Sequence, residues 1–230
     1  MPALTVPSPA QSADQGFYSR LAKPIWNRIA GSAHRITFPA PDRRSFAVAR
    51  YVEANGEGKV MLQIRGRIGS LVVDLGPGVG SELLWAPDSR ALFVTTSDEG
   101  ANGSYRTVVI SSFDGHLQAR DLTPLVANRF GNPIKCEVPE LPNVGGVCWR
   151  PDSRSLLVAA EIVNHSVCDS AGTFRLFQVD PWTMTVLRSF GQLQAKEQFG
   201  AELGIELSNA SDECIRRPEK CRVHASDKAR

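Results

Sequence analysis

Apolar residues recur with a period of two, alternating between two faces, across the stretch "SELLWAPDSRALFVTT" (81–96). Leu83 and Trp85 share one face of its first half, and Leu92 and Val94 share one face of its second half. Such alternation is typical of β-strands, and apolar residues on both faces indicate strands covered on both sides. A proline followed by aspartate and serine favours a tight turn. The stretch is therefore predicted to be a β-hairpin.

The same layout returns 64 residues later in "GGVCWRPDSRSLLVAA" (145–160). A third, weaker copy, "PDRRSFAV" (41–48), aligns without gaps on "PDSRALFV", with Phe38 near the tryptophan position. The positions that define the two strong copies are Trp85, Pro87, Asp88, Trp149, Pro151 and Asp152. A second hairpin follows each copy, so each unit is predicted to be four antiparallel strands, which is the composition of a propeller blade.

The expected fold is all-β and propeller-like but partial, with three blades and a short N-terminal helix. Leu21, Ile25 and Ile29 recur every four residues after a leader rich in proline and serine, and Pro24 suits the first turn of an amphipathic helix. The predicted order is a disordered leader at 1–16, the helix at 17–33, blades at about 34–78, 79–125 and 143–191, and a cap with a polar tail at 192–230.

The Trp-x-Pro-Asp-Ser-Arg hairpin resembles the TolB-type, WD40-like β-propeller repeat, whose common form is Trp-Ser-Pro-Asp-Gly-Lys/Arg. Asp180-Pro181-Trp182-Thr183 is similar to that family's bend between the third and fourth strands. The resemblance implies one of three roles: a partner-binding module of the bacterial envelope, a gating domain of a serine peptidase, or a sensor domain of a regulator. It also implies a periplasmic or envelope location, although the first residues do not resemble a signal peptide.

Three blades are fewer than the four to eight of closed propeller rings. Open blade faces would favour self-association. Two chains could close a six-blade ring, the helix and tail could cap the ends, or the chain could be a piece of a longer protein. The last two alternatives are favoured.

The remaining composition excludes several classes of function. A net charge of +2 is too small to indicate a nucleic-acid binder, and no apolar run is long enough to span a membrane. There is no Gly-x-Ser-x-Gly nucleophile motif, and "GPGVGS" (76–81) lacks the lysine of a nucleotide-binding loop. The four histidines show no ligand spacing. We therefore expect no catalytic residues, no cofactor and no metal.

The five cysteines differ in their surroundings. Cys148 takes the strand position of Leu84 and is expected to be a small buried hydrophobe. The other four allow two disulfides, Cys214 with Cys221 and Cys136 with Cys168, with free thiols as the alternative.

Long loops gather on one expected face of the blades. They are the connections from second to third strands and from one blade to the next. Because binding residues often lie on loops held by a rigid scaffold, we expect a protein or other partner there, with loop variation without function as the alternative. The expected contacts are Arg129, Phe130, Lys135 and His165. The sequence thus indicates a non-enzymatic interaction module; alternatively, the chain is the propeller portion of a larger enzyme or regulator.

Overall fold

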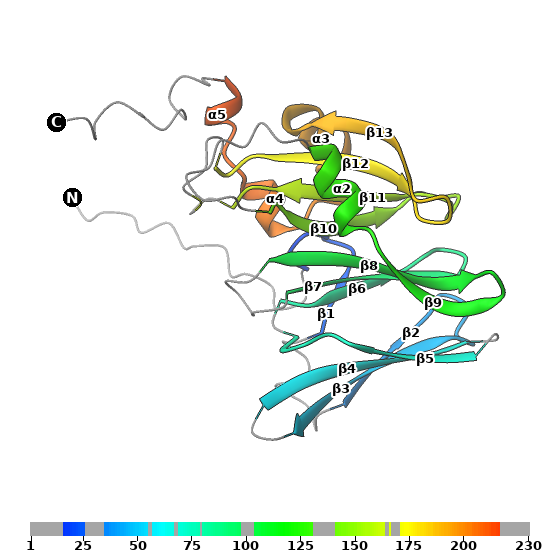
Figure 1. Ribbon diagram of the computed structural model, residues 1–230. Helices are drawn as coiled ribbons and strands as arrows, with labels where there is room; N and C mark the ends of the chain where they lie inside the picture. Colours follow the sequence, from blue (N-terminus) through cyan, green and yellow to red (C-terminus); the bar gives the residue numbers. More distant parts are fainter. Residues whose placement is uncertain are drawn as a thin grey trace, which may run out of the picture.

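Three antiparallel sheets stack one above another in the computed structural model (Figure 1). The structure describes residues 16–25, 35–54, 57–66, 69–78, 80–97, 104–130, 141–163, 166 and 171–216. The sheets follow one another in the order of the sequence, and we call them blades 1, 2 and 3.

Each blade runs up and down through four consecutive strands. Blade 1 comprises β2 (Arg35–Pro39), β3 (Phe46–Ala54), β4 (Glu57–Gly66) and β5 (Gly69–Asp74). Blade 2 comprises β6 (Glu82–Trp85), β7 (Ala91–Ser97), β8 (Tyr105–Phe113) and β9 (His116–Asp121). Blade 3 comprises β10 (Asn143–Trp149), β11 (Leu156–Glu161), β12 (Phe174–Asp180) and β13 (Thr185–Gly191). The predicted partial propeller-like fold is confirmed.

The hydrophobic core lies in layers between the blades. Leu62 of β4 packs in one cluster with Leu92 of β7, between blades 1 and 2. Phe93, the next residue of β7, packs in a second cluster with Val158 of β11, between blades 2 and 3. Both faces of β7 are therefore buried, which explains why its sequence is apolar at consecutive positions rather than at alternate ones.

A helix, α2 (Thr123–Phe130), occupies the beginning of the long connection between blades 2 and 3. It contacts strands of both blades, and its Val126 is fully buried between them. The sequence analysis treated this stretch as loop, which is wrong. The helix begins because the Asp121 carboxylate accepts the Thr123 amide at 2.8 Å and Pro124 fits the first turn.

The outward face of blade 3 is covered by the segment that follows it. This segment contains α3 (Gln192–Phe199), α4 (Ile205–Asn209) and α5 (Glu213–Arg216). Phe199 and Leu207 pack in a third cluster with Leu157 of β11 and Leu176 of β12. These side chains replace the apolar surface that a fourth blade would offer.

The outward face of blade 1 carries charged side chains among exposed apolar ones such as Val52 and Val72. Side chains alternate between the faces of β3 and β4, and those opposite the core include the exposed Arg50 and Arg65. Lys59 on the same face forms an ion pair with Asp74 of β5 at 2.7 Å. The exposed charges keep this face hydrated, as in the terminal repeats of stacked proteins.

Residues 16–25, which we call the strap, are extended. Within them β1 (Lys23–Pro24) pairs antiparallel with β6, and the Ile25 amide donates to the Ser81 carbonyl at 2.7 Å. The prediction of a helix over 17–33 is therefore wrong for residues 17–25, while residues 26–34 lie outside the described part of the chain. The pairing with β6 supplies backbone hydrogen bonds that a solvent-exposed helix would have made within itself.

The strap also joins blade 2 to the segment that covers blade 3. Ser19 forms an isolated antiparallel bridge with Leu203, and the Gly204 amide donates to the Tyr18 carbonyl at 2.8 Å. The Tyr18 side chain is fully buried and lies against Gly145 of β10. The strap thus connects blade 2 to the C-terminal segment that covers blade 3.

We expect Gly145→Ala to displace the strap and lower the free energy of unfolding by about 1–3 kcal/mol. A Cβ at this position would lie 2.0 Å from Cγ of Tyr18, which is far too close for two carbon atoms. Urea unfolding measures the loss, and limited trypsin digestion after the exposed Arg20 reports the displaced strap. Gly191→Ala is the matched control, because its Cβ would meet nothing within 4 Å. Equal stability of the two variants would contradict the packing described.

Candidate functional site

The bends between the first two strands of each blade have one shared construction. In each bend an aspartate Oδ1 accepts the backbone amide of the arginine two residues later. These bonds join Asp42 to Arg44 at 2.8 Å, Asp88 to Arg90 at 3.0 Å, and Asp152 to Arg154 at 2.9 Å. The aspartates therefore fix the shape of the bends, as expected for this residue in turns.

The residue between the aspartate and the arginine is left-handed in all three bends. Its φ is 57° at Arg43, 64° at Ser89 and 58° at Ser153. Glycine adopts this conformation with the least strain, and it occupies this position in the common form of the repeat that the bends resemble. The two serines therefore need a separate explanation.

Each serine accepts a hydrogen bond from the preceding blade. The Asp42 amide of blade 1 donates to Oγ of Ser89 at 2.9 Å, and the Asp88 amide of blade 2 donates to Oγ of Ser153 at 3.1 Å. The serine hydroxyl therefore binds one bend to the next and offsets the strain of its own backbone. Glycine could not do this.

The tryptophans of the hexapeptide reach back in the same way. Nε1 of Trp85 donates to the Phe38 carbonyl at 3.2 Å, and Nε1 of Trp149 donates to the Leu84 carbonyl at 3.1 Å. Phe38 and Leu84 are equivalent, since each immediately precedes the tryptophan position of its own blade. Tryptophan and serine together form what we call a junction, a pair of hydrogen bonds from one blade to its predecessor.

Blade 1 carries neither junction residue. The strand register places Pro39, rather than Phe38, at the position of Trp85, because Pro39 pairs with Phe46 as Trp85 pairs with Leu92. Arg43 stands at the serine position. Three blades have two interfaces, and this accounts for two copies of the hexapeptide.

We expect substitution by glycine to stabilise the protein at one of two equivalent positions and to leave its stability nearly unchanged at the other. Arg43→Gly should raise the free energy of unfolding by about 0.5–1 kcal/mol, because it relieves a left-handed backbone and breaks no junction. Ser153→Gly relieves the same strain but removes the acceptor of the Asp88 amide, which offsets the gain by about 1 kcal/mol. Urea denaturation of both variants measures the difference. Stabilisation of equal size at the two positions would refute the role given to Ser153.

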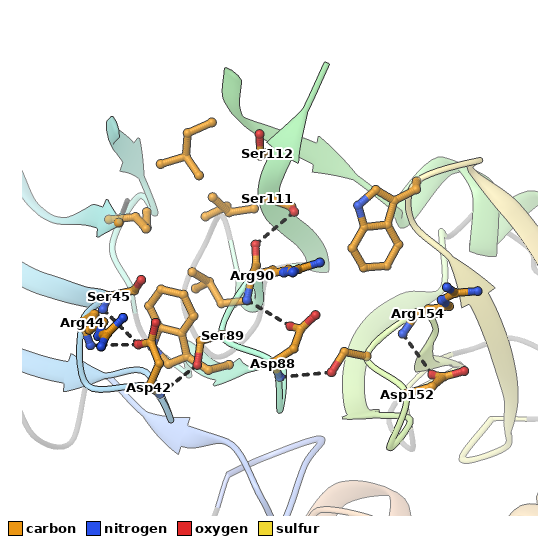
Figure 2. Close-up of a pocket in the computed structure, with 18 of the residues that line it drawn as sticks. Asp42, Arg44, Ser45, Asp88, Ser89, Arg90, Ser111, Ser112, Asp152 and Arg154 are labelled. Atoms are coloured by element: carbon orange, nitrogen blue, oxygen red, sulfur yellow. Dashed lines mark hydrogen bonds between the residues drawn. The ribbon is translucent and has the colours of Figure 1, made fainter. Parts of the chain in front are cut away.

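The three bends form one side of a cavity of about 1140 Å³ (Figure 2). The charged bends of blades 1, 2 and 3 lie in a row, and Ser111 and Ser112 of β8 lie across from them. Apolar side chains from blades 1 and 2 complete the lining, among them Ile64, Leu92 and Leu117. The cavity combines an apolar floor with a charged rim, which is the usual composition of a ligand site.

Trp182 belongs to the wall of the cavity that blade 3 contributes. The Asp180 carboxylate accepts the Trp182 amide at 2.8 Å, and Arg120 of blade 2 donates to the Trp182 carbonyl at 2.7 Å. Its ring centroid lies 6.1 Å from that of Trp149, the tryptophan of the second junction. The wall is therefore held in place by one contact with blade 2 and one within blade 3.

The arginines and aspartates of the rim differ in their partners. The aspartates Asp42, Asp88, Asp152 and Asp180 each accept backbone amides of their own bends. Arg44, Arg90 and Arg154 are exposed, and within the described part of the chain their guanidinium groups have no hydrogen-bonding or ionic partner. Three cationic groups therefore remain free to bind a ligand.

The contacts predicted from the sequence lie elsewhere. Arg129 and Phe130 are the last two residues of α2 and do not line the cavity, and Phe130 packs partly against the core between blades 2 and 3. Lys135 and His165 lie outside the described residues. The structure thus does not test the predicted group as a whole. The sequence analysis missed the cavity, although the recurring Asp-x-Arg of the bends was a usable signal for it.

The cysteine predictions are tested at one position. Cys148 is 3% exposed, and burial raises the pKa of its thiol to about 12, so the expectation of an inert buried residue is confirmed. Cys136, Cys168 and Cys221 lie outside the described residues, as does the side chain of Cys214.

Two carboxyl groups are buried beneath the strap and do not line the cavity. Glu82 accepts the amides of Phe17 and Tyr18 at 2.5 and 3.2 Å. Glu161 accepts the Tyr18 hydroxyl at 3.1 Å through Oε2, and among the described residues its Oε1 has no hydrogen-bond partner. Burial raises the pKa of each carboxyl to about 8.

Within the ranges that the structure describes, no group of three or more His, Cys, Asp or Glu is placed to hold a metal ion. Within those same ranges no helix is long and apolar enough to cross a membrane.

Comparison with known proteins adds one structural likeness. No protein-family model matches the chain, and no curated protein matches its sequence significantly. Among solved structures, the chain is similar to the Pyrococcus horikoshii acylaminoacyl peptidase in its orthorhombic crystal form, with a TM-score of 0.37 and 11% sequence identity. The match covers 64% of this chain and 23% of the peptidase chain. The propeller-like assignment therefore rests on the three sheets themselves.

Proposed function

We propose that the protein is a non-enzymatic binding module that holds a peptide segment of a protein partner in the cavity at the three bends. The observation that carries this proposal is the position of the cavity. Its lining comes from all three blades, and its rim consists of the residues that the repeat places at equivalent points. A site assembled from several repeats is how stacked-repeat proteins bind extended ligands.

Binding is favoured over catalysis by the state of the rim carboxylates. A general acid or base must exchange protons with a substrate, and it must be free to contact it. Here Oδ1 of Asp42 accepts the amides of both Arg44 and Ser45, and Oδ1 of Asp180 accepts those of Trp182 and Thr183. These groups shape the site and leave recognition to the arginines, the serines and the apolar floor.

Selection from a phage-displayed library of random dodecapeptides on the immobilised full chain tests the proposal. We expect the selected peptides to lose at least ten-fold in affinity for Ser112→Tyr, because the ring would fill part of the cavity. Arg129→Gln, which changes the exposed end of α2, is the matched control and should leave the affinity unchanged.

The opposite pattern would overturn the proposal. Peptides that bind Ser112→Tyr normally but lose affinity for Arg129→Gln would place the partner on the face with the long connections. A selection that yields no peptide specific for the folded chain would also contradict the assignment of a peptide-binding cavity.

A further inference from the structure

Three free guanidinium groups stand at equivalent positions around one cavity. Arg44, Arg90 and Arg154 each follow the aspartate of their bend by two residues, one in each blade, and all three line the same space (Figure 2). The backbone nitrogen of each arginine is bound to that aspartate, so the root of each side chain is fixed. The repeat therefore delivers three similar donors along one side of the site.

Within the described part of the chain these donors lack acceptors, whereas three serines nearby are already hydrogen-bonded. A guanidinium carries five N–H donors and pairs best with a carboxylate in a two-pronged geometry. Ser111 already donates to the Arg90 carbonyl, and Ser89 and Ser153 already accept from neighbouring bends. The three guanidinium groups are thus unmet donors at the rim, and carboxylate acceptors on a ligand would suit them.

The net charge of the rim narrows the class of ligand further. Against the three arginines stand Asp42, Asp88, Asp152 and Asp180, so the lining carries three positive and four negative side chains. A uniform polyanion such as a nucleic acid binds through an excess of positive charge, which this rim lacks. Acidic groups that are spaced apart can each meet an arginine while avoiding the carboxylates between them.

We propose that the cavity selects an acidic peptide segment, whose spaced carboxylates pair with Arg44, Arg90 and Arg154 while its apolar side chains lie against the partly exposed Leu117. The proposal rests on the binding function given above and adds the chemistry of the partner. The half-buried rings of Trp85 and Trp182 border the same space and offer further apolar contact. Binding of the peptide then depends on short-range contacts and on the spacing of its carboxylates, rather than on a general attraction for anions.

Fluorescence anisotropy with labelled synthetic peptides tests this. The probes are peptides with three glutamates separated by one, two or three Leu or Gly residues, together with matched peptides in which glutamine or lysine replaces every glutamate. We expect one spacing to bind at least ten-fold more tightly than its glutamine counterpart, and the lysine peptides not to bind.

Single arginine variants then test whether the peptide carboxylates bind the rim of the cavity. Arg44→Gln, Arg90→Gln and Arg154→Gln should each weaken the best glutamate peptide about ten-fold, since loss of a charged hydrogen bond commonly has an effect of this size. All three side chains are exposed and without partners in the described structure, so the variants should fold normally. Arg129→Gln is the matched control, with an exposed arginine outside the cavity, and should bind as the unchanged protein does.

The outcomes separate this inference from the function on which it rests. If library peptides bind and Ser112→Tyr blocks them, but glutamate and glutamine probes bind alike or the three arginine variants change nothing, the binding function stands and the acidic ligand is wrong. If a polyglutamate without spacing binds best and 0.5 M salt abolishes its binding, the cavity is a general anion site and the inference is overturned. If no peptide responds to Ser112→Tyr, the binding function itself fails.

Discussion

Trp149→Ala should lower the free energy of unfolding by about 3–5 kcal/mol, as is usual when a large buried aromatic side chain is truncated. Trp149 is 6% exposed and lies in the core between blades 2 and 3, 6.5 Å from the ring of Phe93. The variant loses this packing and also the bond from its indole nitrogen to the Leu84 carbonyl. Urea denaturation followed by circular dichroism measures the loss.

Trp149→Phe separates the hydrogen bond from the packing. Phenylalanine keeps most of the apolar surface but leaves the Leu84 carbonyl without the indole donor, so we expect a smaller loss of about 1–3 kcal/mol. Trp85→Phe breaks the equivalent bond of the first junction and should cost a similar amount. If both phenylalanine variants are as stable as the unchanged protein, the tryptophans stabilise the fold only by packing. The stabilising role given to the indole hydrogen bonds of the junctions would then be wrong.

The second large effect is a fall in stability as the pH rises from about 4.5 to 8. Glu82 is fully buried, and desolvation raises the pKa of its carboxyl from 4.5 to about 8 although backbone amides of the strap oppose the rise. Across this range the unfolded chain has lost the proton of Glu82 while the folded chain retains it. The folded state binds more protons, so its stability is fully present below pH 4.5 and is lost as pH rises toward 8.

The expected size of the fall in stability follows from the shift in the pKa of Glu82. A group whose folded and unfolded forms differ in protonation contributes roughly 1.4 kcal/mol per pH unit, which amounts to about 4–5 kcal/mol for Glu82 over the whole window. Glu161 acts in the same direction. Burial raises its pKa to about 8, and the neighbouring Glu206 adds to the rise while the hydrogen bond from Tyr18 opposes it.

The measurement is the free energy of unfolding in urea at pH 5, 6, 7 and 8. The hydrogen bond from Lys59 lowers the pKa of Asp74, so protonation of Asp74 destabilises the fold only in stronger acid. Measurements that start at pH 5 avoid this effect. Glu82→Gln removes one of the two groups, and we expect it to reduce the pH dependence by about half. Stability that is constant or rises from pH 5 to 8 would refute buried protonated carboxyls beneath the strap.

The blades could be predicted from the sequence because their signals are local. Alternation around Trp85 and Trp149, with a Pro-Asp turn after each, depends only on residues close in sequence. The helix expected over 17–33 failed for the opposite reason. The spacing of Leu21 and Ile25 suits a helix, but the strap is held by Glu82, which lies 65 residues from Phe17. Such long-range partners override local periodicity.

The site was hidden from the sequence for the same physical reason. The cavity exists because three bends, separated by 46 and 64 residues, are brought side by side, and the bonds that align them connect Asp42 to Ser89 and Asp88 to Ser153. The sequence showed that the hexapeptide was repeated. The strand register was needed to show that its serine and tryptophan bind the preceding blade. The register also explains why blade 1, which has no preceding blade, carries Pro39 and Arg43 at these positions.

Hydrogen exchange by NMR on ¹⁵N-labelled protein tests the junctions most directly, and with them the claim that the hexapeptide joins successive blades. The indole N–H groups of Trp85 and Trp149 and the amides of Asp42 and Asp88 should exchange slowly, since all four donate across a junction. The Asp152 amide occupies the equivalent place in the third bend and has no acceptor among the described residues, so it should exchange rapidly. Exchange at Asp42 and Asp88 as fast as at Asp152 would contradict the account.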